Sequence, residues 1–188
     1  MIYTQSVSDM DAKLISSILE IDALVYPDHL RGTFDEVYGR FKANRDMFVL
    51  LLDAEDIIGY ICFFPVKDAL YDSILNEDRI FDSDISSDMI EAYVPNKTHK
   101  LYFISAVIHP SYQGRGLSNL LVDGLCQFLV GKSKEGISFS TALATSVTPE
   151  GEFLCKRLGF TEIKRLPGPS GYAVHELDIS DLLRRINT

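Results

Sequence analysis

The chain has 188 residues, 46% of them apolar and 24% charged, and its formal net charge at pH 7 is −9. This mix is that of an ordinary globular protein, and the length suits one domain of roughly 100–200 residues, which excludes a disordered chain, a collagen-like fibre and a coiled coil. The acidic balance disfavours nucleic-acid binding, because that function needs a basic surface.

Apolar residues recur along the chain with the spacings of strands and helices. Short β-prone or strongly apolar runs predict strands, in chain order, over residues 2–7, 48–52, 58–64, 101–108, 139–145, 161–166 and 172–179. Apolar residues at helical spacing predict helices over residues 10–24, 33–41, 117–129 and 149–158. Strands 48–52 and 58–64 flank a turn rich in Asp and Glu, which predicts an antiparallel hairpin.

Four residues are expected to fix helix ends and helix packing. Thr33, with a glutamate three residues later, is a capping-box pattern for the second helix. Thr148, followed by proline, is a favoured helix start, and Gly159 is the matching stop. Gly124 falls on or near the apolar stripe of the third helix, which indicates close packing against a neighbouring element.

Charge is unevenly distributed along the sequence. Residues 68–98 hold eight acids against Arg79 and Lys97, a balance of −6, whereas residues 100–160 carry +2. The scattered apolar residues of 68–98 predict one or two short helices, inserted between strands without forming a second domain. Either this segment is a solvated acidic loop, or it borders the site of a cationic ligand.

The sequence predicts a cytoplasmic protein with reduced thiols and no metal site. Its longest apolar run, residues 57–66, is far shorter than the ~20 residues of a membrane helix, and its first residues lack a signal-peptide pattern. Cys62, Cys126 and Cys155 lie in apolar stretches without motif spacing, which disfavours a disulfide framework or a zinc site.

The segment that suggests chemistry begins where a buried strand ends at Pro110 and runs through Gln113–Ser118 into an amphipathic helix. Backbone N–H groups at a helix start lack internal partners, glycines allow a phosphate to approach them, and Arg115 adds positive charge. A pyrophosphate site is one interpretation, and an ordinary strand–loop–helix joint is the other. A dinucleotide fingerprint is disfavoured because Asn119 stands where its third glycine belongs, and the lysine of a Walker loop is absent.

Two motifs resemble the GCN5-related N-acetyltransferase (GNAT) family. Gln113-Gly114-Arg115-Gly116-Leu117-Ser118, after Val107-Ile108-His109-Pro110, resembles the family signature Gln/Arg-x-x-Gly-x-Gly/Ala, with serine at its last position. Leu154–Phe160 resembles the helix end Leu-Tyr-x-Lys-x-Gly-Phe, and the order of predicted elements fits over nearly the whole chain. The resemblance implies one domain over residues 1–188 with the α/β acyl-CoA N-acyltransferase fold, a mixed twisted sheet of about seven strands flanked by about four helices.

The resemblance also implies how acetyl-CoA would bind as co-substrate. In the family, two adjacent parallel strands splay apart and hold the pantetheine arm, here beside the backbone of Ala106, Val107 and Ile108. The pyrophosphate would lie against the backbone of Gln113, Gly114, Arg115, Gly116, Leu117 and Ser118. Thr148 stands where many members keep an asparagine near the cofactor, although helix capping explains this residue equally well.

The catalytic residues carry over less completely. Family members often keep a carboxylate at two positions that are apolar here, Ile104 and Leu143. The remaining candidates for the base are a water chain and a distant acid such as Glu91 or Glu176. Cys155 replaces the tyrosine that usually protonates the departing thiolate. A thiol can donate that proton, but a small buried thiol that only packs is the alternative.

His109, His175 and Tyr172 are further candidates for roles near the site. His109 lies just past the strand and is interpreted mainly as a loop residue. His175 alternates with apolar neighbours, which indicates a hydrogen-bonded core histidine more than a base. Tyr172 can line the acceptor cleft.

The expected function is acetyl transfer from acetyl-CoA to a primary amine by direct attack. The acceptor would be a cationic small molecule or a peptide or protein amine, because the acidic segment would steer positive charge. The alternative is a non-catalytic acyl-CoA-binding sensor or partner module. No nucleic-acid, membrane or metal partner is expected, a homodimer is consistent with the family, and the acyl chain length stays open.

Overall fold

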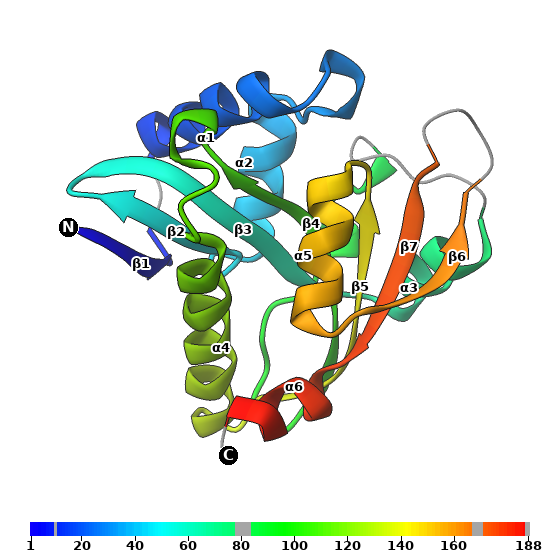
Figure 1. Ribbon diagram of the computed structural model, residues 1–188. Coiled ribbons are helices and arrows are strands. Elements are labelled where there is room, and N and C mark those ends of the chain that lie inside the picture. The colour runs from blue at the N-terminus through cyan, green and yellow to red at the C-terminus, as the bar shows by residue number, and fades with distance from the viewer. Residues whose placement is uncertain (10, 78–83, 167–170, 187–188) are drawn as a thin grey trace.

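The computed structural model describes residues 1–9, 11–77, 84–166 and 171–186. Within these ranges seven strands form one mixed sheet in the order β1-β2-β3-β4-β5-β7-β6 (Figure 1). The strands are β1 (Ile2–Val7), β2 (Phe48–Asp53), β3 (Asp56–Val66), β4 (Thr98–Ile108), β5 (Ser138–Ser146), β6 (Thr161–Arg165) and β7 (Ala173–Asp178). The α-helices are α1 (Ala12–Val25), α2 (Phe34–Ala43), α3 (Asp68–Asn76), α4 (Ser118–Lys134), α5 (Pro149–Leu158) and α6 (Ile179–Ile186).

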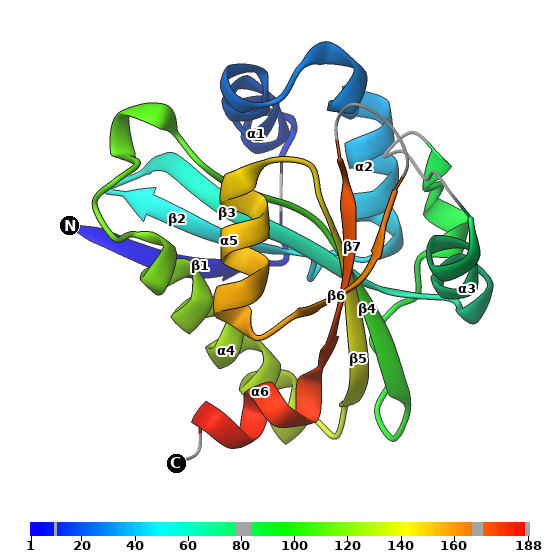
Figure 2. The ribbon, with the colours of Figure 1, turned by 45° about the vertical axis from the view of Figure 1, so that its right-hand side comes forward.

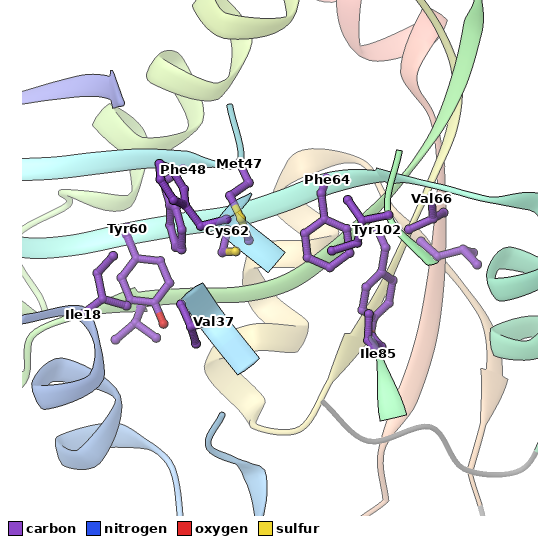
Figure 3. Packing of buried hydrophobic residues seen from close by; sticks show 14 of the residues in the cluster. Ile18, Val37, Met47, Phe48, Tyr60, Cys62, Phe64, Val66, Ile85 and Tyr102 are labelled. Carbon is purple, nitrogen blue, oxygen red and sulfur yellow. The ribbon is translucent and has the colours of Figure 1, made fainter. Parts of the chain in front are cut away.

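Helices cover both faces of the sheet, and each face has its own apolar cluster (Figure 2). Alternate residues of β2 turn to opposite faces, so that Phe48 and Leu50 pack with α1 and α2 while Val49 and Leu51 pack with α4. A strand buried on both faces needs a continuous apolar run, which is what residues 48–52 supply. Figure 3 shows the first cluster, where Phe48 and Tyr60 meet edge to face.

All seven expected strands and the four expected helices are confirmed. The capping box forms as predicted, because Thr33 accepts the Glu36 N–H and the Glu36 carboxylate accepts the Thr33 N–H. Thr148 caps α5, and Gly159 ends that helix with a left-handed φ of 93°. These ends are set by neighbouring residues, and this is why the sequence predicts them.

The structure has two α-helices, α3 and α6, besides the four that the sequence predicts over residues 10–24, 33–41, 117–129 and 149–158. α3 is one of the short helices expected in the acidic segment 68–98, whose residues 78–83 lie outside the described part of the chain. α6 was not predicted, because alternating apolar residues extended the last expected strand to Ile179. The Asp178 carboxylate accepts the Ser180 N–H at 2.8 Å and so ends β7 and begins the helix. Leu182 of α6 is buried in the second cluster.

The feature of the fold that creates a site is the divergence of β4 from β5. Their parallel pairing runs from Thr98↔Ser138 to Phe103↔Ala144, whereas β4 continues to Ile108 paired only with β3. The β3–β4 register also shifts between Cys62 and Phe63, which places Ile104 in a β-bulge. The second half of β4 therefore presents an edge toward β5 that no described strand covers, as the expected splay requires.

Candidate active site

Two hollows follow the gap between β4 and β5. The inner cleft is lined by residues of α1, β4, β5, α5 and the β6–β7 region, among them Asp22, Tyr26, Ile104, Ser105, Ala106, Ser146, Cys155 and Tyr172. The outer cleft is lined among others by Leu24, Ala106, Val107, Ile108, Gln113, Gly114, Gly116, Leu117, Ser118, Thr148 and Phe153. Both hollows share Tyr26, Ala106, Thr148, Gly151 and Leu154, so they form one continuous cleft.

The β4 edge of the cleft presents backbone hydrogen-bonding groups. The His109 N–H donates to the Ile58 oxygen of β3 at 2.8 Å. In an antiparallel ladder successive residues turn to alternate sides, so the N–H and C=O groups of Ala106 and Ile108 point away from β3, toward the gap. The Gln113 side chain already donates to the Ile108 oxygen at 2.8 Å, whereas the Ala106 groups face the joined part of the clefts.

The loop before α4 is built to expose its amides. Gly114 and Gly116 both adopt a φ of +72°, a conformation that L side chains rarely adopt, and no described atom lies within 4 Å of a Cβ added at either position. No described carbonyl accepts from the amides of residues 114–116, while the Gln113 N–H donates to the Pro110 oxygen. Exposed amides at the positive end of a helix dipole form an anion site.

Arg115 is held away from the cleft wall. Its guanidinium donates to the Ser111 oxygen at 2.7 Å and stacks on the Tyr112 ring at 4.9 Å. Of the residues in the loop 113–118, it is the one that does not line the outer cleft. Its charge therefore acts near the loop, while the amides form the surface that a ligand would meet.

Cys155 lies in the inner cleft on the sheet-facing side of α5. The side chain is 8% exposed, so the thiol is largely withdrawn from water. Burial raises the pKa of this thiol to about 12, and the nearby Glu152 carboxylate adds to the rise. Cys155 therefore keeps its proton at neutral pH. Cys62 and Cys126 are also buried cysteines.

Ser146 and His175 form a buried pair under the floor of the inner cleft. The Ser146 hydroxyl lies 2.8 Å from Nε2 of His175, and Nδ1 of this fully buried ring has no partner among the described residues. Burial lowers the pKa of His175, although the Glu162 and Glu152 carboxylates oppose the shift. The expectation of a hydrogen-bonded core histidine is confirmed.

This lowered pKa predicts a pH-dependent stability. The unfolded chain binds a proton on His175 near its ordinary pKa of about 6.5, whereas the folded chain binds one only at lower pH. The stability linked to His175 is therefore complete above pH ~6.5 and is lost as the pH falls toward the lower folded pKa. Between pH 7 and pH 5.5 we expect urea unfolding to show a steeper stability loss in wild type than in His175→Gln, by at most ~1.4 kcal/mol per pH unit. Equal slopes would contradict this account.

A further group of side chains, missed by the sequence analysis, meets at the inner end of the cleft. Asp22 of α1 accepts a short hydrogen bond from the Tyr60 hydroxyl of β3. The Tyr60 oxygen lies 3.0 Å from the Ser105 hydroxyl at the β4 bulge, and Ser105 donates to Tyr26 at 3.3 Å. The signal that could have revealed this group is an aspartate on the apolar stripe of α1, one turn beyond Ile18.

The two distant acids lie away from the cleft. The Glu91 carboxylate binds Lys97 at 2.7 Å and contacts His99 at 3.2 Å. The Glu176 carboxylate accepts the Tyr71 hydroxyl at 2.7 Å. Neither residue lines the inner or the outer cleft.

Four other candidate residues lie in or near the inner cleft, in the core or in the loop after β4. Ile104 lines the inner cleft, while Leu143 is fully buried in the first apolar cluster. His109 accepts the Ser111 N–H at 3.2 Å and so caps a short 3-10 turn. Tyr172 lines the inner cleft, and its place on the acceptor side stays a prediction.

The described residues of the acidic segment 68–98 lie outside the inner cleft. None of them lines it, because α3 packs beside the start of β4, with Lys100 paired to Asp68 at 2.8 Å. The expectation that this segment borders the acceptor site therefore stays a prediction, which the described residues of the segment do not support. The acid that does line the inner cleft is Asp22.

The described parts of the chain contain neither a cluster of metal ligands nor a helix suited to a membrane. No cluster of three or more His, Cys, Asp or Glu residues there is arranged to hold a metal ion. Across those same residues, no helix has both the length and the apolar character that crossing a membrane requires.

Comparison with known proteins gives a family match and a set of structural relatives. Residues 15–160 match the model of the Acetyltransferase (GNAT) family. No curated protein matches the sequence. The loading GNATL domain of CurA from Lyngbya majuscula is 13% identical, with a TM-score of 0.65 over 96% of this chain and 99% of that one.

Two further solved structures show the same fold. NAA60 of Arabidopsis thaliana, in complex with acetyl-CoA, is 14% identical, with a TM-score of 0.62 over 96% of this chain and 99% of that one. The ribosomal-protein-S18-alanine N-acetyltransferase of Escherichia coli is 13% identical, with a TM-score of 0.57 over 95% of this chain and 94% of that one. At these identities the likeness shows the fold alone.

Proposed function

Because the chain belongs to the Acetyltransferase (GNAT) family, we propose that it moves an acetyl group from acetyl-CoA to a primary amine by direct attack. The observation that carries this proposal is the continuous cleft that joins the uncovered edge of β4 to the exposed amides before α4. Two of the structural relatives support this proposal. The Arabidopsis relative was solved with acetyl-CoA, and the Escherichia coli relative is named an N-acetyltransferase.

The proposed position of acetyl-CoA follows the cleft from its outer to its inner end. The diphosphate accepts from the amides of the loop 113–118, above all from residues 114–116, whose N–H groups donate to no described backbone carbonyl. The pantetheine arm lies along Ala106–Ile108, as a short additional strand would. Thr148, at the start of α5, faces the arm from the other wall, and its side-chain oxygen already accepts the Gly151 N–H at 3.0 Å.

The reaction takes place where the two clefts meet. A neutral amine nitrogen attacks the thioester carbonyl carbon, whose oxygen is polarised by backbone N–H groups near Ala106. The tetrahedral intermediate then collapses, so that the C–S bond breaks and the nitrogen gives its extra proton to water. The departing thiolate takes up a proton and leaves as CoA.

We propose Cys155 as the donor of that last proton. It is the titratable residue of α5 in the inner cleft, and it stays protonated at neutral pH because burial raises the pKa of its thiol to about 12. The same burial would also raise the pKa of the CoA thiol that forms beside Cys155. The two thiols would then have similar acidities.

Cys155→Ala tests this assignment. We expect kcat to fall about 100- to 10,000-fold, the usual contribution of a positioned general acid, with the Kd of acetyl-CoA changed less than twofold. Stopped-flow thiol detection and calorimetry measure the two quantities. Cys126→Ala, which removes another buried thiol outside both clefts, is the matched control. An unchanged kcat would make Cys155 a packing residue.

The function as a whole is tested by thiol release. Acetyl-CoA is incubated with millimolar spermidine, a peptide with a free N-terminus and a peptide with an internal lysine. Release of CoA that depends on one of these amines, with a matching increase in the mass of the acceptor, is the expected result. Both spermidine and the peptides present a primary ammonium, the group that the acidic inner cleft suits.

The apolar character of Ile104 and Leu143 favours a second candidate, an acyl-CoA-binding module without catalysis. Tight binding of acetyl-CoA by calorimetry, with no CoA released in the presence of any of the three amines, would support this alternative and contradict the proposed activity.

A further inference from the structure

The inner cleft contains a buried carboxylate to which neither the family signature nor the sequence analysis gives a role. Asp22 lies in the last turn of α1, is 8% exposed and lines the inner cleft. Burial of a carboxylate is costly unless it is hydrogen-bonded, and the bond from Tyr60 supplies such a partner. A carboxylate kept at this position, on an otherwise apolar helix face, calls for a function.

Three hydroxyl groups connect Asp22 to the point where the reaction would occur. The Tyr60 hydroxyl donates to Asp22, its oxygen lies 3.0 Å from Ser105, and Ser105 lies 3.3 Å from Tyr26. Ser105 directly follows the bulged Ile104, and it precedes Ala106 at the junction of the inner and outer clefts. The chain of contacts therefore begins beside the proposed thioester and ends on a carboxylate.

Tyr60 can pass a proton along this chain but cannot retain a negative charge. Burial, reinforced by the charge of Asp22 and by Tyr26, raises the pKa of Tyr60 well above its ordinary value. Its ring is fixed between Phe48 and the α1 side of the first cluster, as Figure 3 shows. Tyr60 therefore receives one proton on its oxygen as it gives another to Asp22, and it stays neutral.

We propose that Asp22, acting through Tyr60 and Ser105, is the proton acceptor that converts the bound acceptor ammonium into the neutral amine that attacks the thioester. This inference rests on the proposed acetyl transfer. The ammonium gives a proton to the Ser105 oxygen, the Ser105 hydroxyl turns from Tyr26 and gives its own proton to Tyr60, and Tyr60 gives its own to Asp22. The products are a neutral amine and a protonated Asp22, so charge and protons balance.

The same carboxylate defines the class of acceptor. A negative charge buried at the inner end attracts an amine that arrives as its ammonium form, as alkyl amines do at neutral pH. At this end of the cleft the titratable groups Asp22 and Tyr26 both act on Tyr60, and each raises the pKa of its hydroxyl. An arrangement of this kind suits an aliphatic primary amine and disfavours an anionic acceptor.

Asp22→Asn is the test, because the amide oxygen can still accept the Tyr60 hydrogen bond but cannot take up a proton. The assay follows CoA release with spermidine and with the lysine peptide, from pH 6.5 to 9.5. At pH 7 we expect kcat/KM for the amine to fall at least tenfold, while the Kd of acetyl-CoA changes less than twofold. The deficit should shrink toward pH 9.5, as the amine becomes neutral in solution.

Two further variants make the result decisive. Asp28→Asn removes a negative charge from the segment after α1 without touching either cleft, and it should leave the pH profile unchanged. Ser105→Ala interrupts the chain without altering the carboxylate, so it should reproduce the pH-dependent deficit even if Asp22→Asn fails to fold.

The outcomes separate this inference from the proposed function. If wild type releases CoA with an amine and Asp22→Asn matches it at pH 7, or loses the same factor at every pH, the role of Asp22 is overturned and acetyl transfer stands. If wild type binds acetyl-CoA but releases no CoA with any amine, the proposed function fails, and the inference fails with it.

Discussion

Gly116→Glu is expected to weaken acetyl-CoA binding at least ~100-fold. The added side chain would project into the open space beside the loop amides, where the diphosphate is proposed to lie, and its carboxylate would repel that anion. Two lost charge-assisted hydrogen bonds, at about 1.5–3 kcal/mol each, account for an effect of this size. Calorimetric titration with acetyl-CoA measures it.

Two comparisons isolate the cause of that loss. Gly136→Glu shares the backbone strain, because Gly136 has a φ of +83°, but it lies at the opposite end of α4 and should bind acetyl-CoA like wild type. Acetyl-pantetheine, which lacks the diphosphate, should bind Gly116→Glu and wild type equally. Wild-type affinity of Gly116→Glu for acetyl-CoA would contradict the assignment of the loop.

The second large effect is expected on the stability of the folded protein, at the position where α4 packs against the sheet. A Cβ added at Gly124 would lie 2.7 Å from the Thr4 hydroxyl oxygen and 2.9 Å from a Val49 methyl, so α4 or β1 must shift to accept it. Gly124→Ala is therefore expected to destabilise the protein by about 1–3 kcal/mol. The close packing predicted for this glycine from its place on the apolar stripe is confirmed.

Gly131 offers a control on the same helix. No described atom lies within 4 Å of a Cβ added at Gly131, so Gly131→Ala should stabilise α4 by up to ~1 kcal/mol through helix propensity. Thermal unfolding of the two variants should move Tm in opposite directions, by roughly 2–4 °C for each kcal/mol. A Gly124→Ala variant as stable as Gly131→Ala would mean that α4 is not packed as closely as the structure shows.

Elements governed by neighbouring residues were predictable from the sequence. The apolar run of β2 and the cap and stop of α5 are local signals, and the structure reproduces them. α6 was not predictable in this way, because the alternation of apolar residues continues to Ile179 and the helix depends on the Asp178 cap and on burial of Leu182 against distant elements.

The site was predictable only in part. The loop 113–118 and the β4 edge could be proposed from the sequence because a motif and a strand lie next to each other in the chain, and all but Arg115 of the positions proposed for the cofactor line the outer cleft. Charge content could not place the acidic segment, since composition carries no spatial information. The Asp22 group joins residues 38 and 45 positions apart, and no local pattern reveals such contacts.

A crystal structure of the protein with acetyl-CoA tests the central assignment most directly. We expect diphosphate oxygens within hydrogen-bond distance of the amides of residues 114–118, the pantetheine arm beside Ala106–Ile108, and the thioester next to Ser105. A diphosphate bound elsewhere on the molecule, or a gap between β4 and β5 that stays unfilled at saturating acetyl-CoA, would contradict the account.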